Sequence, residues 1–241
     1  MERPTETSMF IRTKGLLRIG EVHFDEQPDG EPVDVLRYNQ SAVRIPNSKS
    51  RRFDSLLVDL TMDAADIFAA IKKDSRNEIR LCLKDGIQYE CQSPVGPDEL
   101  LRFCHEYDKF ASSKQRPRAN RSRLLAIAAT GGMDISYVGT PGGNILVRHV
   151  HLRVGARARL IHTVSFYRQS SDSALRSLIG RGNRYHHWCD IQYYKRRGLA
   201  VYDLGGWYSG ERDREKVSIN EFKAEFGGRV VNEFNCLVGR T

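Results

Sequence analysis

The residues best suited to chemistry in this sequence form a stripe on one predicted helix. They follow one another at intervals of four, three and four residues: Asn183, His187, Asp190 and Tyr194. Residues at that spacing share one face of an α-helix. An imidazole that is oriented by a carboxylate can take a proton from an amine, so His187 and Asp190 are candidate catalytic residues. The competing interpretation is a solvated face with no catalytic role; for the stripe as a whole we favour the wall of a cleft, with Trp188 and Tyr194 as candidate substrate-binding residues.

A basic, glycine-containing segment just before this stripe is the candidate donor site. We expect the helix to begin here, so that its free N–H groups and the positive end of its dipole face a phosphate. The glycines would permit close approach, and the arginines would add charge. The candidate cofactor-binding residues are Arg176, Gly180, Arg181, Gly182, Asn183 and Arg184. An ordinary basic helix start interrupted by glycines fits the same residues equally well.

Three polar residues nearer the C-terminus are further candidates. Asp203 ends an apolar strand just before two glycines. A carboxylate at that edge of an α/β sheet is placed to bind the incoming amine or to act as a catalytic base, and an aspartate that caps a turn is the alternative. Asn220 and Lys223 are placed to hold an anionic acceptor, although a helix-start asparagine and a surface lysine explain them better.

Histidines are also found on a predicted hairpin. His149 and His151 share one strand face, and His162 is expected opposite His151. No carboxylate shares their spacing, so we predict a polar sheet face and no metal site. The sequence holds no GxSxG motif and no defined Cys/His pair. Direct attack by an acceptor amine is therefore favoured over a covalent acyl-enzyme.

The elements that must position these residues follow a mixed α/β order. Hydrophobic periodicity predicts strands at 10–19, 42–45, 55–60, 87–91, 134–138, 144–154, 158–167, 199–204 and 229–238. It predicts helices at 63–84, 97–112, 121–129 and 173–197, and a last one that starts with a capping box at Ser218 and Glu221. This order indicates a mixed sheet with helices on both faces. Residues 1–52 are expected to be an irregular extension or partial lobe, and residues 53–241 the main domain.

Two local motifs, together with this order, resemble the GNAT acyltransferases and, within them, the FemAB-like branch. The first is a helix that carries Trp188, ends in Lys-x-x-Gly and leads to a strand ending Tyr202-Asp-Leu-Gly-Gly206. The second is Ile219-Asn-Glu-Phe-Lys-Ala-Glu-Phe-Gly-Gly228. The resemblance covers residues 55–241 and implies a GNAT-like, largely antiparallel mixed sheet. In such a sheet two central strands, here 158–167 and 199–204, separate, and donor and acceptor meet in the gap.

The resemblance also implies an activity. FemAB-like enzymes transfer aminoacyl groups from aminoacyl-tRNA to peptidoglycan precursors, and their GNAT relatives use acyl-CoA. FemAB enzymes have two lobes, whereas this chain has the length of a single lobe. The GNAT pyrophosphate loop reads Arg/Gln-x-x-Gly-x-Gly/Ala, whereas the segment from Arg176 to Gly182 has one residue more.

The amino-acid composition limits the kinds of binding partner and the cellular location that we expect. A net charge of +8 suggests a phosphate-bearing partner, although an ordinary basic protein carries the same charge. Five cysteines without a CxxC argue against a disulfide framework and a zinc knuckle. No window approaches the ~18 apolar residues of a membrane span, and the N-terminus lacks the apolar core of a signal peptide. We therefore expect a cytoplasmic protein.

These observations predict an N-acyltransferase. It would move an acyl group from acyl-CoA, or a similar thioester, to an amino group on a sugar or cell-envelope precursor, such as a nucleotide-sugar or a lipid-linked intermediate. The alternatives are a FemAB-like aminoacyltransferase that uses aminoacyl-tRNA, and a non-catalytic basic binding module on the same fold.

Overall fold

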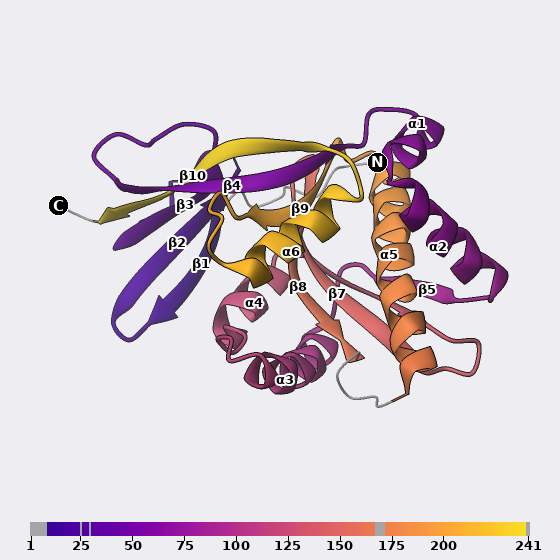
Figure 1. Ribbon diagram of the computed structural model, residues 1–241. Coiled ribbons are helices and arrows are strands. Elements are labelled where there is room, and N and C mark those ends of the chain that lie inside the picture. Colours follow the sequence, from indigo (N-terminus) through magenta and orange to yellow (C-terminus); the bar gives the residue numbers. More distant parts are fainter. Residues whose placement is uncertain (1–8, 25, 29, 167–171, 240–241) are drawn as a thin grey trace.

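One continuous sheet organises the computed structural model, which describes residues 9–24, 26–28, 30–166 and 172–239. Its strands are β1 (Met9–Lys14), β2 (Leu17–His23), β3 (Val35–Ser41), β4 (Lys49–Asp59), β5 (Gln88–Gln92), β6 (Met133–Gly139), β7 (Ile145–Val154), β8 (Arg157–Ser165), β9 (Val201–Trp207) and β10 (Arg229–Gly239). Across the sheet they run in the order β1-β2-β3-β10-β4-β9-β8-β7-β6-β5 (Figure 1). Only the β2–β3 and β8–β9 pairs are parallel, so the predicted mixed, largely antiparallel sheet is confirmed.

Helices cover both faces of the sheet, as the element order predicted. They are α1 (Ala64–Ala70), α2 (Lys73–Lys84), α3 (Pro97–Ser113), α4 (Arg121–Ala128), α5 (Ser173–Arg196) and α6 (Arg214–Ala224). On β7, Val147 belongs to the core that includes α2 and α5, whereas Val150 belongs to the core under α3 and α4. Alternate residues of this strand thus support the two layers. Within the described residues, no helix combines the length and apolarity needed to cross a membrane.

The N-terminal region differs from the irregular extension that we expected. The predicted strand at 10–19 is the hairpin of β1 and β2, turned at Gly15, which has a φ of +61°. Residues 42–45 form a loop, and β4 begins at Lys49 instead of residue 55. All four strands join the sheet, with β10 between β3 and β4. The proposed boundary at residues 52 and 53 falls inside β4, and the division of the chain into two units stays a prediction.

Two predicted helices have different bounds in the structure. The helix expected at 63–84 is divided into α1 and α2, because Ile71 and Lys72 have extended backbones and the Lys72 N–H bonds to the Glu225 carbonyl at 2.8 Å. The capping box at Ser218 is wrong. Helix α6 begins earlier, where the Asp213 side chain accepts a hydrogen bond from the Lys216 N–H at 3.2 Å.

The feature that matters most for the site is the separation of β8 from β9. Among the described residues, the two strands pair over three residues each: Arg157 to Arg159 of β8 lie beside Val201 to Asp203 of β9. Past this point β9 stays with β4, across an irregularity in their register. Gly205 has a φ of +82°, and a side chain there would approach the Leu160 carbonyl to 3.2 Å, so glycine is required at this bend. The gap that the resemblance implied is therefore present.

Candidate functional site

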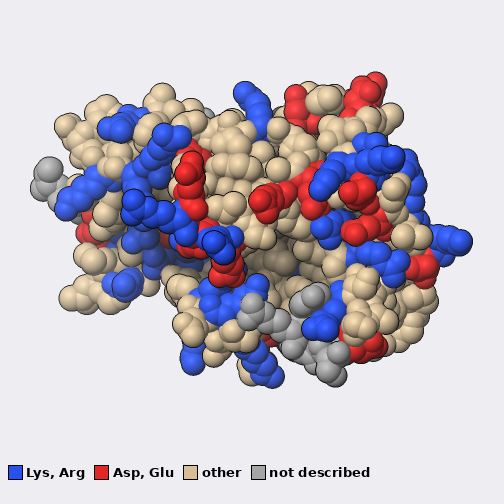
Figure 2. Space-filling model, viewed as in Figure 1, with Lys and Arg blue, Asp and Glu red and all other residues tan. Residues whose placement is uncertain are grey.

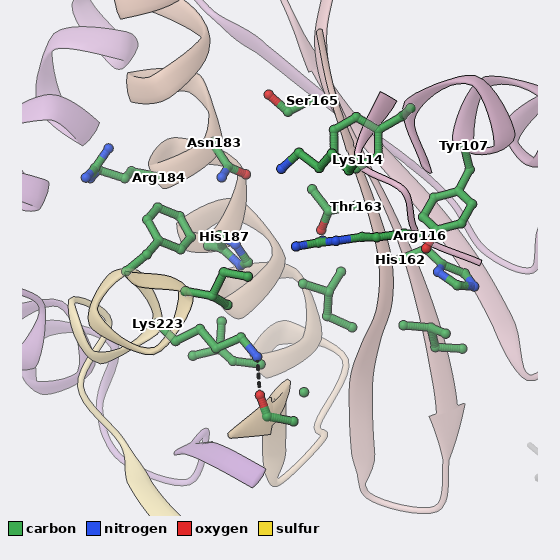
Figure 3. Close-up of a pocket in the computed structure, with 18 of the residues that line it drawn as sticks. Tyr107, Lys114, Arg116, His162, Thr163, Ser165, Asn183, Arg184, His187 and Lys223 are labelled. Atoms are coloured by element: carbon green, nitrogen blue, oxygen red, sulfur yellow. Dashed lines mark hydrogen bonds between the residues drawn. The ribbon is translucent and has the colours of Figure 1, made fainter. Parts of the chain in front are cut away.

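A cavity of ≈ 710 Å³ opens where β8 and β9 separate. Its floor is formed by residues 159–163 and 165 of β8 and by residues 204–206 of β9. Helix α5 forms one wall with Ile179, Gly180, Asn183, Arg184 and His187, and α6 contributes Ser218, Ile219, Phe222 and Lys223. The opposite wall comes from the end of α3 and the segment after it, with Tyr107, Phe110, Lys114 and Arg116 (Figure 3). Segments far apart in the sequence thus meet around one space.

The charge of this lining is one-sided. Five described lining residues are basic, Lys114, Arg116, Arg159, Arg184 and Lys223, and none of the described lining residues is acidic. Figure 2 shows Lys and Arg side chains on either side of the central hollow of this face, with Asp and Glu side chains among them. A cavity of this charge attracts anions and disfavours a protonated amine.

His187 is the predicted catalytic residue that reaches the cavity. It is 3% exposed, and its Nδ1 lies 3.2 Å from the Tyr202 hydroxyl. That hydroxyl donates to Asp190 Oδ2 at 3.4 Å. With its own hydrogen directed to Asp190, the Tyr202 oxygen can accept the Nδ1–H of His187, and in that tautomer Nε2 is unprotonated. Burial lowers the pKa of His187 well below its ordinary value, and His149 lowers it further, so the imidazole is neutral.

Asp190 lies behind this wall and does not line the cavity. It is fully buried, and its oxygens accept from Ser136 at 2.7 Å and Tyr89 at 3.0 Å. His149 Nδ1 lies 2.7 Å from Asp190 Oδ2, and His149 Nε2 lies 3.3 Å from Asn183 Oδ1. Burial raises the pKa of Asp190, but neighbouring histidines outweigh that effect and keep the carboxyl ionised. The expected direct pair of His187 and Asp190 is therefore a contact through Tyr202.

This cluster also has the residue types of a metal site. His149, His187 and Asp190 each present one ligand atom, and those atoms lie within 4.8 Å of one another. Imidazole and carboxylate groups suit Zn²⁺. The same atoms are engaged in the hydrogen bonds described above, so the fold explains them without an ion. The absence of a metal stays a prediction, which elemental analysis of the purified protein tests.

The expected donor site is not a helix start. Helix α5 begins at Ser173, where Asp172 accepts a hydrogen bond from the Ala174 N–H at 2.8 Å, so Gly180 and Gly182 lie well inside the helix. Their N–H groups are not the free ones of a first turn. A side chain at Gly182 would approach Leu146 to 3.2 Å, so this glycine allows α5 to pack on the sheet.

The polar residues predicted beside these glycines have defined partners. Arg181 pairs with Asp85 at 3.3 Å, and Arg184 pairs with Glu225 at 2.7 Å. Arg176 borders a shallower depression of ≈ 410 Å³ with Arg181 and Arg184, and this depression meets the cavity at Gly180 and Arg184. Asn183 lines the cavity itself. The segment is thus a basic surface inside α5, and the free N–H groups that we expected these glycines to present to a phosphate are not available there.

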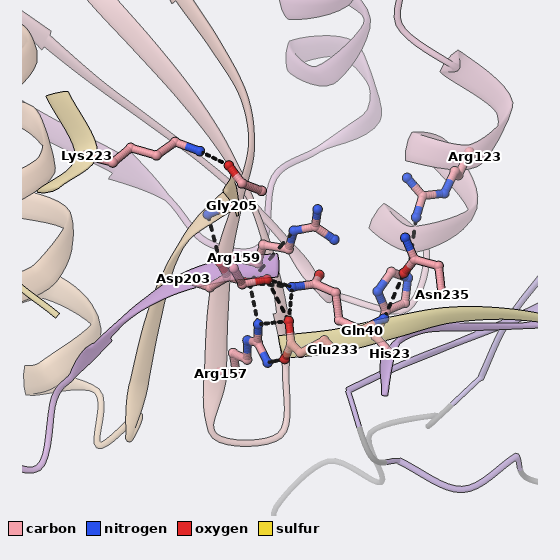
Figure 4. A network of polar contacts seen from close by, with 12 residues as sticks. His23, Gln40, Arg123, Arg157, Arg159, Asp203, Gly205, Lys223, Glu233 and Asn235 are labelled. Atoms are coloured by element: carbon pink, nitrogen blue, oxygen red, sulfur yellow. Dashed lines mark hydrogen bonds and ion pairs between the residues drawn. The ribbon is translucent and has the colours of Figure 1, made fainter. Parts of the chain in front are cut away.

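Asp203 belongs to a buried ionic network beside the cavity (Figure 4). It is fully buried, and its Oδ2 accepts from Arg157 at 2.7 Å and from Gln40 at 2.9 Å. Its Oδ1 accepts from the Gly205 N–H at 2.7 Å. Glu233 completes the network through Arg157 at 2.5 Å. A carboxylate held in this way stabilises the strands, and its surroundings do not match the free base that we expected.

Of the four predicted substrate-binding residues, one lines the cavity. Trp188 packs in the core, with its ring 4.8 Å from that of Phe68. Tyr194 is buried and donates to Asp134 at 3.1 Å. Asn220 holds the backbone of Tyr208 through bonds of 3.1 Å and 2.7 Å. Lys223 lines the cavity and donates to the Gly206 carbonyl at 2.6 Å.

The sequence analysis missed the wall opposite α5. Tyr107, Lys114 and Arg116 line the cavity, and Tyr107 lies 4.3 Å from His162, measured between ring centroids. His162 was considered only as a metal ligand. Arg159 was not singled out, although an arginine within an apolar strand was a signal that could have identified it.

The fold is similar to that of known structures at low sequence identity. No family model and no curated protein sequence matches the chain. The crystal structure of FemX has a TM-score of 0.66 at 11% identity, covering 95% of this chain and 83% of that one. The C-terminal domain of a protein assigned as a lysylphosphatidylglycerol synthetase, from Agrobacterium fabrum, has a TM-score of 0.58 at 15% identity, covering 95% and 80%. L-PGS from Bacillus licheniformis has 0.53 at 10%, covering 95% and 79%.

These similarities concern the fold. They confirm that the chain has the FemX-like arrangement that the two sequence motifs indicated, over almost its whole length.

Proposed function

We propose that this chain is an acyl-group transferase that moves an aminoacyl group from an activated ester onto the amino group of an acceptor. One observation carries the proposal: β8 and β9 separate just after Arg159 and Asp203, and a cavity lies in the gap with His187 in its wall. The FemAB-like resemblance implies that donor and acceptor meet at this place. The five basic lining residues favour an anionic substrate whose amine is neutral and nucleophilic.

The chemistry that fits this cavity is direct attack by the amine. Its nitrogen forms a bond to the acyl carbon of the donor, and the bond from that carbon to the ester oxygen breaks. The attacking nitrogen becomes acidic as it acquires positive charge, so a neutral imidazole is a sufficient base. His187 Nε2 takes the proton and returns it to the departing oxygen. Tyr202 holds the imidazole in the required tautomer, and Asp190 in turn holds Tyr202.

Two observations favour aminoacyl-tRNA over acyl-CoA as the donor. Gly180 and Gly182 lie inside α5, so their N–H groups cannot cradle a pyrophosphate, and Asp172 accepts a hydrogen bond from one N–H group of the first turn. In addition, one of the similar folds is named as a synthetase of lysylphosphatidylglycerol, an aminoacylated product.

Acyl-CoA remains the second candidate donor because of a specific feature. The depression bordered by Arg176, Arg181 and Arg184 joins the cavity at Gly180. A pyrophosphate could bind to these arginines against the side of α5, and not at the start of the helix. The proposed acceptor for either donor is an amine on a sugar or cell-envelope precursor.

A transfer assay tests the function and separates the two donors. The protein is incubated with a mixture of labelled aminoacyl-tRNAs, or with labelled acetyl-CoA, together with amino sugars and peptide amines. Product that disappears after RNase treatment of the donor supports aminoacyl-tRNA, whereas product from acetyl-CoA assigns the second candidate. If neither donor yields product, and neither raises the midpoint of thermal unfolding, the proposed function is wrong.

A further inference from the structure

Arg159 has an unusual position among the basic residues of the protein. Its Nε is buried without a hydrogen-bond partner, and its guanidinium group lies over the Phe53 ring, 5.1 Å from the ring centroid. The carboxylate that pairs with it is Asp203, whose Oδ2 lies 3.8 Å away and already accepts from Arg157 and Gln40. A guanidinium group has five N–H donors, and buried donors are normally paired. The side chain is 19% exposed and lines the cavity, so its open side faces that space.

Lys223 approaches the same place from α6. Its ammonium group donates to the Gly206 carbonyl at 2.6 Å, and two further N–H donors remain. A side-chain carbon at Gly205 would lie 3.8 Å from Lys223 Nζ, so the ammonium sits directly over the bend of β9 (Figure 4). Lys223 and Arg159 thus line the same cavity from two different elements.

The electrostatics of both groups indicate a missing anion. Burial lowers the pKa of Lys223 to about 8, and the charge of Arg159 contributes to this effect, whereas Asp203 opposes it. Burial also lowers the pKa of Arg159, and the charges of Arg123 and Arg157 add to that effect, whereas Asp203 and Glu233 oppose it. Arg157, by contrast, is matched by Asp203 and Glu233. Two cations therefore line a cavity that has no acidic residue among its described lining residues.

We propose that Arg159 and Lys223 form a binding site for an oxyanion of the substrate, a carboxylate or a phosphate, at the floor of the cavity. The planar fork of Arg159 matches two oxygens of such a group, and Lys223 supplies a compact charge beside it. The site itself follows from these contacts, and its assignment to the substrate rests on the proposed function. An anion anchored here and an amine beside His187 occupy one cavity, so the site selects acceptors or donors that carry both groups.

Binding of small anions to the intact protein tests this assignment. The midpoint of thermal unfolding is measured against increasing inorganic phosphate, and separately acetate, with chloride adjusted to hold the ionic strength constant. We expect one of the two to stabilise the wild type, and which one does so distinguishes a phosphate from a carboxylate site. Arg159→Gln and Lys223→Gln are each expected to weaken binding by about tenfold or more.

The matched control is Arg121→Gln. Arg121 is 51% exposed, pairs with Asp108 at 2.8 Å and does not line the cavity, so its loss should leave anion binding unchanged. If Arg159→Gln fails to fold, Lys223→Gln alone decides the question. A wild type that neither anion stabilises, or variants that bind as the wild type does, would overturn the proposal. Anion binding without transfer activity refutes the proposed function alone, and transfer without anion binding refutes this site alone.

Discussion

Arg157 and Arg159 lie on the same strand two residues apart, yet their surroundings differ sharply. Arg157 donates to Asp203 and Glu233 in a network that also includes Gln40. Arg159 faces the cavity with Asp203 as a distant ionic neighbour. In the first region both terminal nitrogens of Arg157 donate to carboxylates, although Arg157 Nε and Gln40 Oε1 have no hydrogen-bond partner, and the network joins β8, β9 and β10. The second leaves donors unused where a ligand has room, which distinguishes a site that binds from a network that supports the fold.

The largest expected effect is on the free energy of unfolding, which should distinguish Arg157 from Arg159. Arg157→Gln leaves Asp203 and Glu233 without their cation, so we expect the free energy of unfolding to fall by about 3–5 kcal/mol. Arg159→Gln removes a buried charge without close pairing and should change that free energy by less than about 1 kcal/mol. Urea unfolding of both variants measures the difference. Equal losses would show that the two arginines play the same structural role.

The next effect concerns the wall of the cavity. His187→Asn removes the proposed proton acceptor, and we expect the transfer rate to fall by about 10²-fold, or about 2.7 kcal/mol, with little change in substrate binding. Tyr202→Phe keeps the packing but removes the hydroxyl that holds the His187 imidazole in one tautomer. The transfer rate of this variant should fall less than that of His187→Asn, and its pH profile should change. Single-turnover measurements across pH check both variants. A fully active His187→Asn variant would remove His187 from the mechanism.

A smaller effect is expected from the buried histidines behind that wall. Burial lowers the pKa of His151 to about 4, with the charges of Asp190 and His149 acting in opposite directions. Between the ordinary value near 6.5 and about 4, the unfolded chain binds a proton that the folded chain does not. The free energy of unfolding should therefore fall with decreasing pH across this window, by up to about 1.4 kcal/mol per pH unit from this residue.

His151→Gln should reduce that slope by the contribution of one proton. The exposed His105→Gln is the matched control and should leave the slope as in the wild type. Calorimetric or urea unfolding between these pH values gives the slopes. A slope that is the same in all three proteins contradicts the assignment to His151.

Local sequence patterns were sufficient to predict the layers of this fold, whereas the gap in its sheet was implied by the resemblance to the GNAT acyltransferases. The spacing of residues 173–197 predicted α5 almost to the residue, because a long helix with a C-terminal glycine at Gly198 leaves few alternatives. The start of α6 was misplaced because Asp213 and Ser218 both have capping side chains, and tertiary contacts decide between them. The strands before residue 53 were underestimated because β3 and β4 pair with β10, which lies far away in the sequence, and β2 joins the sheet only through β3.

The candidate site was predicted only in part for a similar reason. His187 and Asn183 line the cavity on the helix face that their spacing defined, as do the candidates Gly180 and Arg184, and Lys223 lines it although a surface position explained it better in the sequence. The role of Asp203 was misjudged because Arg157 and Gln40, which neutralise it, come from other strands. The wall at Tyr107 and Arg116 carried no motif, and only the fold brings it to the cavity.

The most direct test of the central claim closes the cavity without disturbing the fold. Gly180 lines the cavity inside α5, and a side-chain carbon there meets nothing within 4 Å. Replacing glycine in a helix should also stabilise it by up to about 1 kcal/mol. The transfer rates of Gly180→Phe, Gly180→Ala and the wild type are measured side by side. We predict that Gly180→Phe is folded and loses activity by about tenfold or more, while Gly180→Ala keeps it; a folded Gly180→Phe variant with the wild-type rate would contradict the claim that transfer takes place in this cavity.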